Sequence, residues 1–390
     1  MKYPRVICLM MAVCLLIGLV ETPSVAASLP EPSHVLVTGE TEVDGVEDAP
    51  GRYGQYREQN IVVTNAGRVV CIAQGRDPSR WSDRSGQDMV VRYSDDSGKT
   101  WGHALLASEH GDYSVCPNAA VYDRDTDTIH VLYSLFLWDF HLTREGPRSV
   151  GDGAECKQFQ ITSDDGGETW TAPRDISHMF PQSRGDVVVF GSGEGIQLEH
   201  GEHAGRLVVP GGLQGLWGNR MFYSDDHGQT WLNGEVAARD LIKDDNVRLE
   251  NKIAELADGR LLMNARCSPI RARAWSSDGG VTWTMQELDP GLEAVSCNGS
   301  ILVVRDETND REVVLCSYPA GPGRTHGVVS VSFDGGETWP VTKRVVETEF
   351  AYSSLIVMPD GEIGLFYEAR GHRDIDLVTF PLSWLLEESE

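Results

Sequence analysis

The sequence lacks the features that mark nucleic-acid-binding proteins and metalloproteins. Lys and Arg together number 33 against 59 Asp and Glu, which gives a formal net charge of -26. A chain so poor in positive charge does not attract phosphate backbones or anionic lipid surfaces, so neither is expected as a partner. The eleven histidines are scattered and form no metal-ligand pattern. No metal or other cofactor is therefore expected.

Cysteine is also scarce, and no C-x-x-C pair occurs. Two of the eight cysteines, Cys8 and Cys14, lie in the first fourteen residues. The spacings of the other six suggest no disulfide framework, and several lie in apolar segments such as the one around Cys71. Buried free thiols are expected, although export would permit disulfides.

Long hydrophobic stretches are absent except for residues 6–20. Lys2 and Arg5 precede this stretch, and the small residues 24–27 follow it. The pattern predicts a signal peptide over residues 1–27, a secreted or periplasmic protein, and a single domain over residues 28–390. An uncleaved anchor is the alternative, although fifteen residues are few for a membrane span. No later stretch is long enough to span a bilayer.

What the sequence does contain is one octapeptide, S-x-D-x-G-x-T-W, repeated five times. The copies lie at residues 94–101, 163–170, 224–231, 276–283 and 332–339. A fixed pattern at such intervals indicates a repeat architecture. In each copy the Asp and Gly fit a tight turn, because Asp accepts backbone N–H groups and Gly adopts positive φ. We interpret the copies as structural turns between strands.

Alternating apolar and polar residues predict strands throughout, with three before each octapeptide. Helix-like stretches are short, and no Pro/Ser-rich linker divides the chain. Five repeats and a last unit at residues 353–380 give units of about sixty residues, which suits four-stranded blades. The prediction is an all-β fold, a six-bladed β-propeller of four-stranded antiparallel sheets. The N-terminal segment is expected to supply the outer strand of the last blade.

Propellers bind ligands at one mouth of the central axis, so functional residues should be scattered along the chain. Arg57, Arg271 and Arg324 occupy such positions, although each alone is also consistent with a surface arginine. Asp83 lies in a polar loop. Glu255 interrupts an apolar segment, where an acid is costly unless it is paired.

The chain resembles bacterial exo-sialidases, which are retaining glycoside hydrolases with Asp-box (BNR) repeats. The resemblance rests on the five octapeptides, the context of Arg57, and residues 195–198, 255–259 and 351–354. It covers nearly all of the chain after the signal peptide. It implies a secreted exo-α-sialidase that removes terminal sialic acids from glycoconjugates with retention of configuration. Sialylated glycoconjugates are then the expected partners.

The resemblance also assigns catalytic roles to three residues. Tyr352 corresponds to the nucleophile, Glu255 to the carboxylate beside it, and Asp83 to the acid/base. A neutral tyrosine suits an anomeric carbon that already carries a carboxylate, because an anionic nucleophile would be repelled. Tyrosine has a pKa near 10, so it needs an adjacent base.

Five further residues are assigned to substrate binding by the same resemblance. Arg57, Arg271 and Arg324 correspond to the arginine triad that binds the substrate carboxylate, a task that suits the planar guanidinium. Arg76 corresponds to a further arginine lining the Asp83 loop. Glu368 corresponds to the acid that holds Arg57.

Two positions depart from the family pattern. Where the family usually has Arg-Ile-Pro, this chain has Arg57-Glu58-Gln59, and Glu58 is expected on the opposite strand face, away from Arg57. Cys116 stands where an aspartate often precedes proline. The preferred linkage and sialic acid variant therefore stay open.

Three functions remain compatible with these residues. Besides a sialidase, the chain could be a related enzyme that acts on another nonulosonic acid or makes an anhydro product by intramolecular transfer. It could also be a non-catalytic carbohydrate-binding propeller. Retention of Tyr352, Glu255 and Asp83 together argues against the last, because binding alone needs only the arginines.

Overall fold

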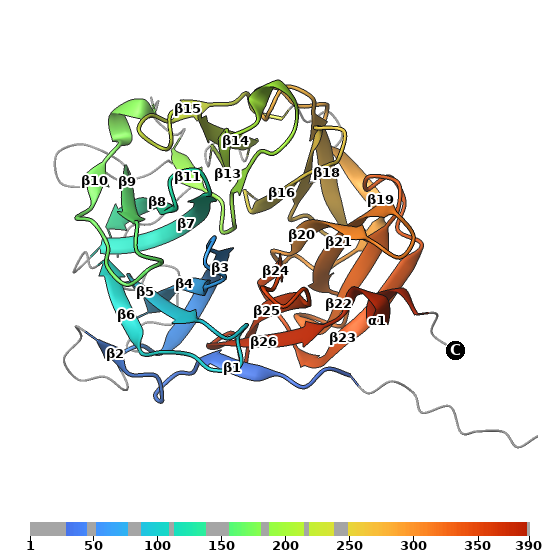
Figure 1. Cartoon of the computed structure of the whole chain (residues 1–390), viewed down its shortest axis with the longest axis horizontal. Helices are drawn as coiled ribbons and strands as arrows, with labels where there is room; N and C mark the ends of the chain where they lie inside the picture. The colour runs from blue at the N-terminus through green and yellow to red at the C-terminus, as the bar shows by residue number, and fades with distance from the viewer. Residues whose placement is uncertain are drawn as a thin grey trace, which may run out of the picture.

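The computed structural model describes residues 29–44, 52–76, 87–108, 113–137, 156–180, 187–213, 218–237 and 249–387. These residues form strands arranged in sheets around a central axis (Figure 1). Within them, helix is confined to α1 (Leu382–Leu386) and the 3-10 turns η1 (Ser177–Met179) and η2 (Gly201–His203). No helix in these ranges is long and apolar enough to span a bilayer. The predicted signal peptide lies outside the described residues.

The first part of the ring consists of two antiparallel runs of four strands. The first run contains β3 (Gln55–Val63), β4 (Val69–Arg76), β5 (Gln87–Ser94) and β6 (Ala104–Ser108). The second run contains β7 (Tyr113–Asp123), β8 (Thr128–Leu137), β9 (Lys157–Ser163) and β10 (Arg174–Asp175). One parallel pair, Gln87 with Ser114, joins the two runs, and β2 (Val43–Asp44) adds to β6. The result is a nine-stranded sheet.

Four further sheets complete the ring. The next holds β11 (Val188–Phe190), β12 (Ile196–Gln197), β13 (Leu207–Leu213), β14 (Gly218–Ser224) and β15 (Leu232–Asn233). It is followed by β16 (Asn251–Glu255), β17 (Leu261–Ala265), β18 (Ile270–Ser276) and β19 (Glu287–Glu293). Then come β20 (Ser300–Asp306), β21 (Arg311–Pro319), β22 (Thr325–Ser332) and β23 (Val341–Glu349). The last sheet holds β24 (Ser353–Val357), β25 (Ile363–Ala369), β26 (Asp374–Phe380) and β1 (Ser33–Leu36).

The all-β prediction and the propeller arrangement are confirmed, but the predicted six separate four-stranded sheets are not found. The described strands form five hydrogen-bonded sheets, of which three have four strands. The difference arises because Gln87 of β5 pairs with Ser114 near the start of β7 and because β2 and β12 add short strands. The expected closure is present, since the N-terminal β1 pairs with β26.

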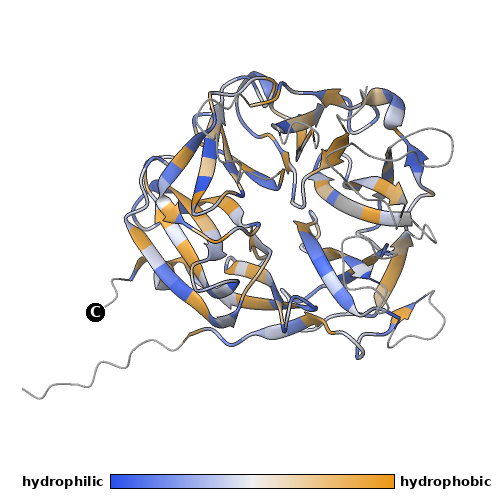
Figure 2. Cartoon of the chain, turned by 180° about the vertical axis from the view of Figure 1, so that it is seen from behind, coloured by the Kyte–Doolittle hydropathy of each residue, from blue (hydrophilic) through white to orange (hydrophobic). Residues whose placement is uncertain are grey.

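The core lies between neighbouring sheets, and Figure 2 shows hydrophobic and hydrophilic residues alternating along many strands. In β4, Val69 and Cys71 pack with β1 and β26, whereas Val70 and Ile72 pack with β8. Both faces of this strand are buried, which explains its continuous apolar sequence. The five described cysteines with a free thiol are all buried, as expected for Cys71, Cys156, Cys267, Cys297 and Cys316.

Each octapeptide forms the same hydrogen-bonded turn. In the last copy, the Ser332 hydroxyl donates to Asp334 Oδ1 at 2.7 Å and accepts from the Gly336 N–H at 2.9 Å. The Thr338 hydroxyl donates to Asp334 Oδ2 at 2.6 Å. The other four copies repeat these bonds. The interpretation as structural turns is therefore confirmed.

The turns also join neighbouring sheets, which the sequence did not predict. The glycine at the fifth position of each copy packs against the preceding sheet. A Cβ placed on Gly98 would lie 2.5 Å from Leu377 of β26, and one on Gly336 would lie 2.4 Å from Leu262 of β17. Arg206 beside β13 bridges in the same way, from Asp225 in its own sheet to the Gly279 carbonyl in the next.

Candidate active site

Tyr352 lies immediately before β24 and is only 7% exposed. Its hydroxyl donates to Glu250 Oε1 at 2.5 Å and accepts from Arg266 Nη1 at 2.9 Å. Burial and the charge of Glu250 raise the pKa of Tyr352 well above its usual value, while Arg266 opposes this rise. The phenol is therefore neutral near pH 7, with a carboxylate in position to accept its proton.

Three guanidinium groups surround the ring of Tyr352. Their central carbons lie 5.3 Å, 6.0 Å and 5.4 Å from the ring centre in Arg57, Arg266 and Arg324 respectively. Arg57 comes from β3, Arg266 follows β17, and Arg324 precedes β22. Three cations so close together can attract an anion even in an acidic protein, because distant charges are screened by salt.

A buried carboxylate fixes Arg57. Its Nε donates to Glu368 Oε1 at 2.9 Å, and Glu368 on β25 is fully buried. Burial opposes the charge of Arg57, but Glu368 outweighs this effect and raises the pKa of Arg57 well above its usual value. The predicted contact between Arg57 and Glu368 is therefore present. It holds one cation of the site in a single orientation.

The sequence placed Arg271 in this group of arginines, but the arginine that the structure places beside Tyr352 is Arg266. Arg271 is fully buried within its sheet, where it donates to Asn264 Oδ1 at 2.5 Å and to the Cys297 carbonyl at 3.1 Å. Arg266 instead follows the end of β17, and its Nη1 lies 2.5 Å from Glu250 Oε2. It is a loop residue at the mouth, whereas Arg271 lies inside β18.

The sequence likewise placed Glu255 beside Tyr352, and the structure puts Glu250 there. Glu255 is the last residue of β16, and its carboxylate accepts the backbone N–H groups of Glu199 and His200 at 2.7 and 3.0 Å. Glu250 precedes the same strand, five residues earlier. Five residues of strand span roughly 16 Å, so the two acids lie at opposite ends of β16.

Strand direction is the sequence signal that could have identified Glu250 and Arg266. Arg57, Tyr352 and Glu250 all lie near the start of the first strand of a sheet. In an antiparallel sheet the end of the second strand returns to this mouth, and Arg266 follows such an end. Glu255 ends a first strand and therefore lies at the other mouth.

Two further residues that the sequence predicted for the site are Arg76 and Asp83. Arg76 ends β4 and is 1% exposed, and its Nη2 donates to Glu58 Oε1 at 2.8 Å. Asp83 lies outside the described residues, as does the side chain of Cys116. The Glu58 carboxylate contacts Arg76, but it is not remote from Arg57 as predicted, because its charge acts on both Arg57 and Tyr352.

The repeats define the family of this chain. The family model described as the BNR repeat-like domain matches residues 67–365, which is well over half of the sequence. The chain belongs to the BNR repeat-like family. Its five octapeptides are the repeats of that name, and they lie at the mouth opposite Tyr352, because each follows the end of a third strand.

The proteins that are similar to this chain include several sialidases. The chain is 31% identical over 367 residues to a sialidase from Micromonospora viridifaciens, which covers 88% of the chain and 54% of the relative. It is 31% identical over 226 residues to an anhydrosialidase from Macrobdella decora, which covers 53% of the chain and 28% of the relative. The chain thus spans about half the length of the first relative.

The solved structures that are similar to this BNR repeat-like chain include the Hadza microbial sialidase Hz136. The TM-score is 0.75 at 25% sequence identity, and the match covers 86% of this chain and 67% of that one. The resemblance to sialidases drawn from the octapeptides is confirmed by these relatives.

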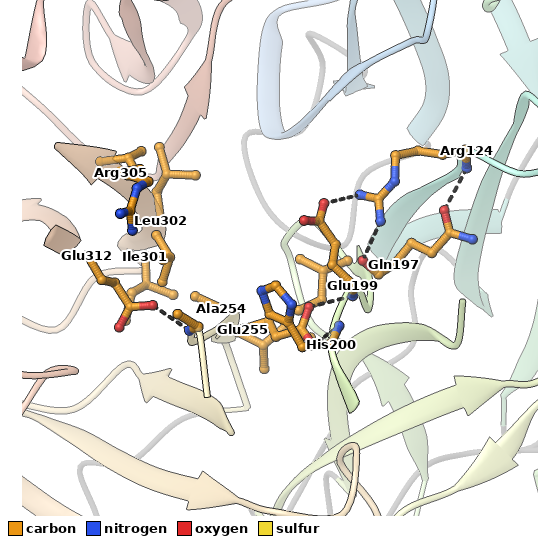
Figure 3. A pocket seen from close by; sticks show the side chains of 15 residues that line it. Arg124, Gln197, Glu199, His200, Ala254, Glu255, Ile301, Leu302, Arg305 and Glu312 are labelled. Atoms are coloured by element: carbon orange, nitrogen blue, oxygen red, sulfur yellow. Dashed lines mark hydrogen bonds and ion pairs between the residues drawn. The ribbon is translucent and has the colours of Figure 1, made fainter. Parts of the chain in front are cut away.

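A separate pocket of about 460 Å³ lies at the end of the central axis opposite to Tyr352. Figure 3 shows Arg124, Gln197 and Glu199 on one side of it and Arg305 and Glu312 on the other. Two of its charged groups, Arg124 and Glu199, pair at 3.0 Å, and Glu312 accepts the Ala257 N–H. Aliphatic side chains form much of its wall. Glu255 belongs to this pocket.

One cluster among the described residues has metal-ligand atoms close together, formed by Asp123, Asp125 and His227. Its groups already bond one another, since His227 Nδ1 lies 2.8 Å from Asp123 Oδ2, and Gln197 donates to both aspartates. Burial works to raise the pKa of Asp123, but bonds from Thr126 and His227 lower it overall. The cluster joins β7 to the turn after β14.

Proposed function

We propose that this protein is a retaining exo-α-sialidase, a glycoside hydrolase that removes terminal sialic acids from glycoconjugates. The observation that carries the proposal is the set of contacts around Tyr352. A neutral phenol lies between the Glu250 carboxylate and the Arg266 guanidinium, with Arg57 and Arg324 on the same ring. A binding module needs the cations but has no use for a phenol paired with a base.

The three arginines bind the substrate carboxylate. Sialic acid carries this group on its anomeric carbon, so fixing the carboxylate also places that carbon above Tyr352. Planar guanidinium groups suit the task, because they donate paired hydrogen bonds to both carboxylate oxygens. Glu368 keeps Arg57 in position, while Glu250 and Ser296 contact Arg266.

Tyr352 acts as the nucleophile in the first step. Its oxygen attacks the anomeric carbon as the bond to the aglycone breaks, and its proton passes to Glu250. The raised pKa makes this base necessary, since the free phenol is protonated at working pH. Arg266 stabilises the phenolate through its 2.9 Å contact. A tyrosine avoids the repulsion that a carboxylate nucleophile would meet at this carbon.

Asp83 is assigned the acid/base role. It protonates the departing aglycone oxygen and then deprotonates the water that releases the sugar from Tyr352. Two inversions at the anomeric carbon give net retention. This assignment is supported by the family resemblance and by the position of Asp83 seven residues after Arg76, which ends β4.

The finer features of fold and location belong to the same proposal. We infer that the two runs of the nine-stranded sheet are separate blades, which gives a six-bladed ring with the usual sialidase arrangement. We also infer that residues 1–27 are a cleaved signal peptide, so that the enzyme is secreted or periplasmic. N-terminal sequencing of exported protein tests this, and a start at Ser28 or Ala27 is the expected result.

A fluorogenic α-sialoside tests the function directly. The protein should release the fluorophore at mildly acidic pH, and Tyr352→Phe should lose most of this activity while keeping its fold. The product should first appear as the α-anomer by proton NMR. Absence of turnover by the wild type would favour a carbohydrate-binding module, and full activity in Tyr352→Phe would exclude the assigned nucleophile.

A second reaction is favoured by the similarity to the Macrobdella decora anhydrosialidase. In that case a hydroxyl of the bound sugar replaces water and yields an anhydro sugar. The same arginines and tyrosine would serve both reactions. Mass spectrometry of the product distinguishes them, because the anhydro sugar is lighter by one water.

A further inference from the structure

Glu58 is a buried acid at the floor of the candidate site. It is 6% exposed, and its Oε1 accepts a hydrogen bond from Arg76 Nη2 at 2.8 Å. Its Oε2 accepts from Gln74 Nε2 at 3.1 Å and from the Ser192 hydroxyl at 2.5 Å. Arg76 is 1% exposed. The pair is therefore a desolvated ion pair, supported by neutral donors on two other strands or loops.

The backbone of Glu58 is also tied to the site. Its φ is 53°, in the left-handed region that residues with a side chain rarely adopt. The strand register shifts between Arg57 and Asn60, and the Glu58 N–H donates to Glu368 Oε1 at 3.0 Å. That same oxygen accepts from Arg57 Nε. Glu58 thus contacts the partner of one arginine through its backbone and a second arginine through its side chain.

A buried acid close to an anion-binding site needs a partner. The negative charge of Glu58 acts on Tyr352 directly, in opposition to Arg57 and Arg266. Breaking a buried ion pair by removing one member is strongly unfavourable for the group that stays behind. Although Arg76 also donates to Gln74 Oε1 at 2.8 and 3.1 Å, it is consequently expected to shift when Glu58 loses its charge.

We propose that Glu58 is a positioning residue of the proposed sialidase site, which links Arg76 to the Glu368–Arg57 pair and holds the β3 and β4 side of the sugar pocket as one unit. This rests on the proposed function. It assigns a role to the residue at which this chain departs from the usual Arg-Ile-Pro pattern. Glu58 acts through the arginines and does not itself contact the reacting atoms.

The matched variants are Glu58→Gln and Glu194→Gln. Glu194 is the control, because it also forms an ion pair, partly buried and 2.7 Å long, with Lys252, and accepts the Ile61 N–H at 2.9 Å. It has no contact with Tyr352 or the three arginines. Both variants should unfold at a lower temperature than the wild type. Only Glu58→Gln should lower kcat/KM for the fluorogenic α-sialoside at least about tenfold, as displaced binding groups do.

A double-mutant cycle separates positioning from general destabilisation. Because Glu58 acts through Arg76, the double variant Glu58→Gln with Arg76→Gln should be no more than about threefold less active than Arg76→Gln alone. The proposal would be overturned if the losses in kcat/KM caused by the two single substitutions multiplied in the double variant. So would kcat/KM within about threefold of wild type in folded Glu58→Gln, or an equal loss in Glu194→Gln.

Crystal structures of wild type and Glu58→Gln give a readout independent of turnover. The expected result is a displaced Arg76 guanidinium, and an unchanged Arg76 would overturn the proposal. If the wild type cleaves no sialoside, the proposed function fails, and a displaced Arg76 would then show a positioning role for Glu58 in a binding site.

Discussion

At the scale of single residues, Tyr352 has two neighbours with opposite effects on its pKa, since Glu250 raises it and Arg266 lowers it. Glu250 favours the neutral phenol, and in the proposed reaction it accepts the phenol's proton. Arg266 favours the phenolate, which the proposed reaction forms when that proton leaves. The same two residues also contact each other, so their positions are coupled. A change to either one should therefore affect the other's contact with Tyr352.

The first prediction compares the two glutamates that compete for the role of base. Glu250→Gln should lower kcat by about 10² or more, within the range for loss of a positioned general base. Glu255→Gln should leave kcat within about threefold of wild type, because it lies at the other end of β16. Steady-state kinetics on the fluorogenic α-sialoside measure both. The reverse order of losses would restore Glu255 as the base.

The sequence could predict four of the residues that converge here, namely Arg57, Arg324, Tyr352 and Glu368. Each lies in a short motif or at a fixed distance from a repeat. Glu250 and Arg266 lie in no such motif, and Glu255 and Arg271 offered the same residue types five residues away. Choosing between them requires knowing at which mouth each strand begins. Periodicity of two predicts a strand but not where it starts and ends.

At the scale of elements, the octapeptide turns link successive sheets of the ring. Their glycines pack on the preceding sheet, and Arg206 reaches the carbonyl groups of the next turn. The sequence predicted the turns because Asp, Gly and Thr recur at fixed spacing. It did not predict the packing partners, which lie on strands of other repeats. Nor could it predict that β5 and β7 pair and merge two runs into one sheet.

The second prediction tests this packing at Gly336. Gly336→Ala and Gly361→Ala both place a side chain at φ +87°, but a Cβ meets Leu262 at 2.4 Å only in the first. The strained backbone should cost about 1–2 kcal/mol in both variants. Gly336→Ala should cost about 1–3 kcal/mol more, because Leu262 is buried and cannot move freely. Urea unfolding measures the difference, and equal losses would refute the packing role.

The third prediction concerns the pH dependence of the same turns. Burial works to raise the pKa of Asp334, but bonds from Thr338 and Ser332 lower it overall. A carboxyl whose folded pKa lies below its unfolded value, about 3.9, stabilises the fold above that value and loses this effect as pH falls. Asp334→Asn should lower the Tm by about 2–4 °C near pH 6.

The difference in Tm between wild type and Asp334→Asn should shrink as the pH falls below about 4, where Asp334 becomes protonated. Differential scanning calorimetry at several pH values measures it. A difference that stays constant down to the most acidic condition in which the protein folds would show that the charge of Asp334 contributes nothing.

At the scale of the whole molecule, the two ends of the chain close the ring. β1 pairs with β26, His34 Nδ1 lies 2.9 Å from Asp376 Oδ1, and the Thr38 N–H donates to Asp374 at 2.6 Å. Without β1, β26 would present unpaired backbone groups at an exposed edge. The sequence predicted this closure correctly, because a closed ring must cover the last strand.

The fourth prediction uses two truncations that differ by residues 29–38, which contain β1 and the Thr38 contact with Asp374. Deleting residues 1–28 leaves β1 intact and should not change the Tm. Deleting residues 1–38 removes β1, and the Tm should fall by several degrees, with association that increases with protein concentration. Thermal unfolding and light scattering measure both effects. Equal behaviour of the two truncations would mean that β1 contributes no stability.

This closure also has a consequence for the order of events during synthesis. Ser33 and Leu377 bond across 344 positions of sequence, so the last sheet forms only when both of these residues have been synthesised. A nascent chain on the ribosome can assemble the earlier sheets but cannot seal them into a ring. Contacts of such long range form slowly, because a large loop must close first. The ring therefore closes only after β26 has been synthesised, and until then β1 lacks its partner strand.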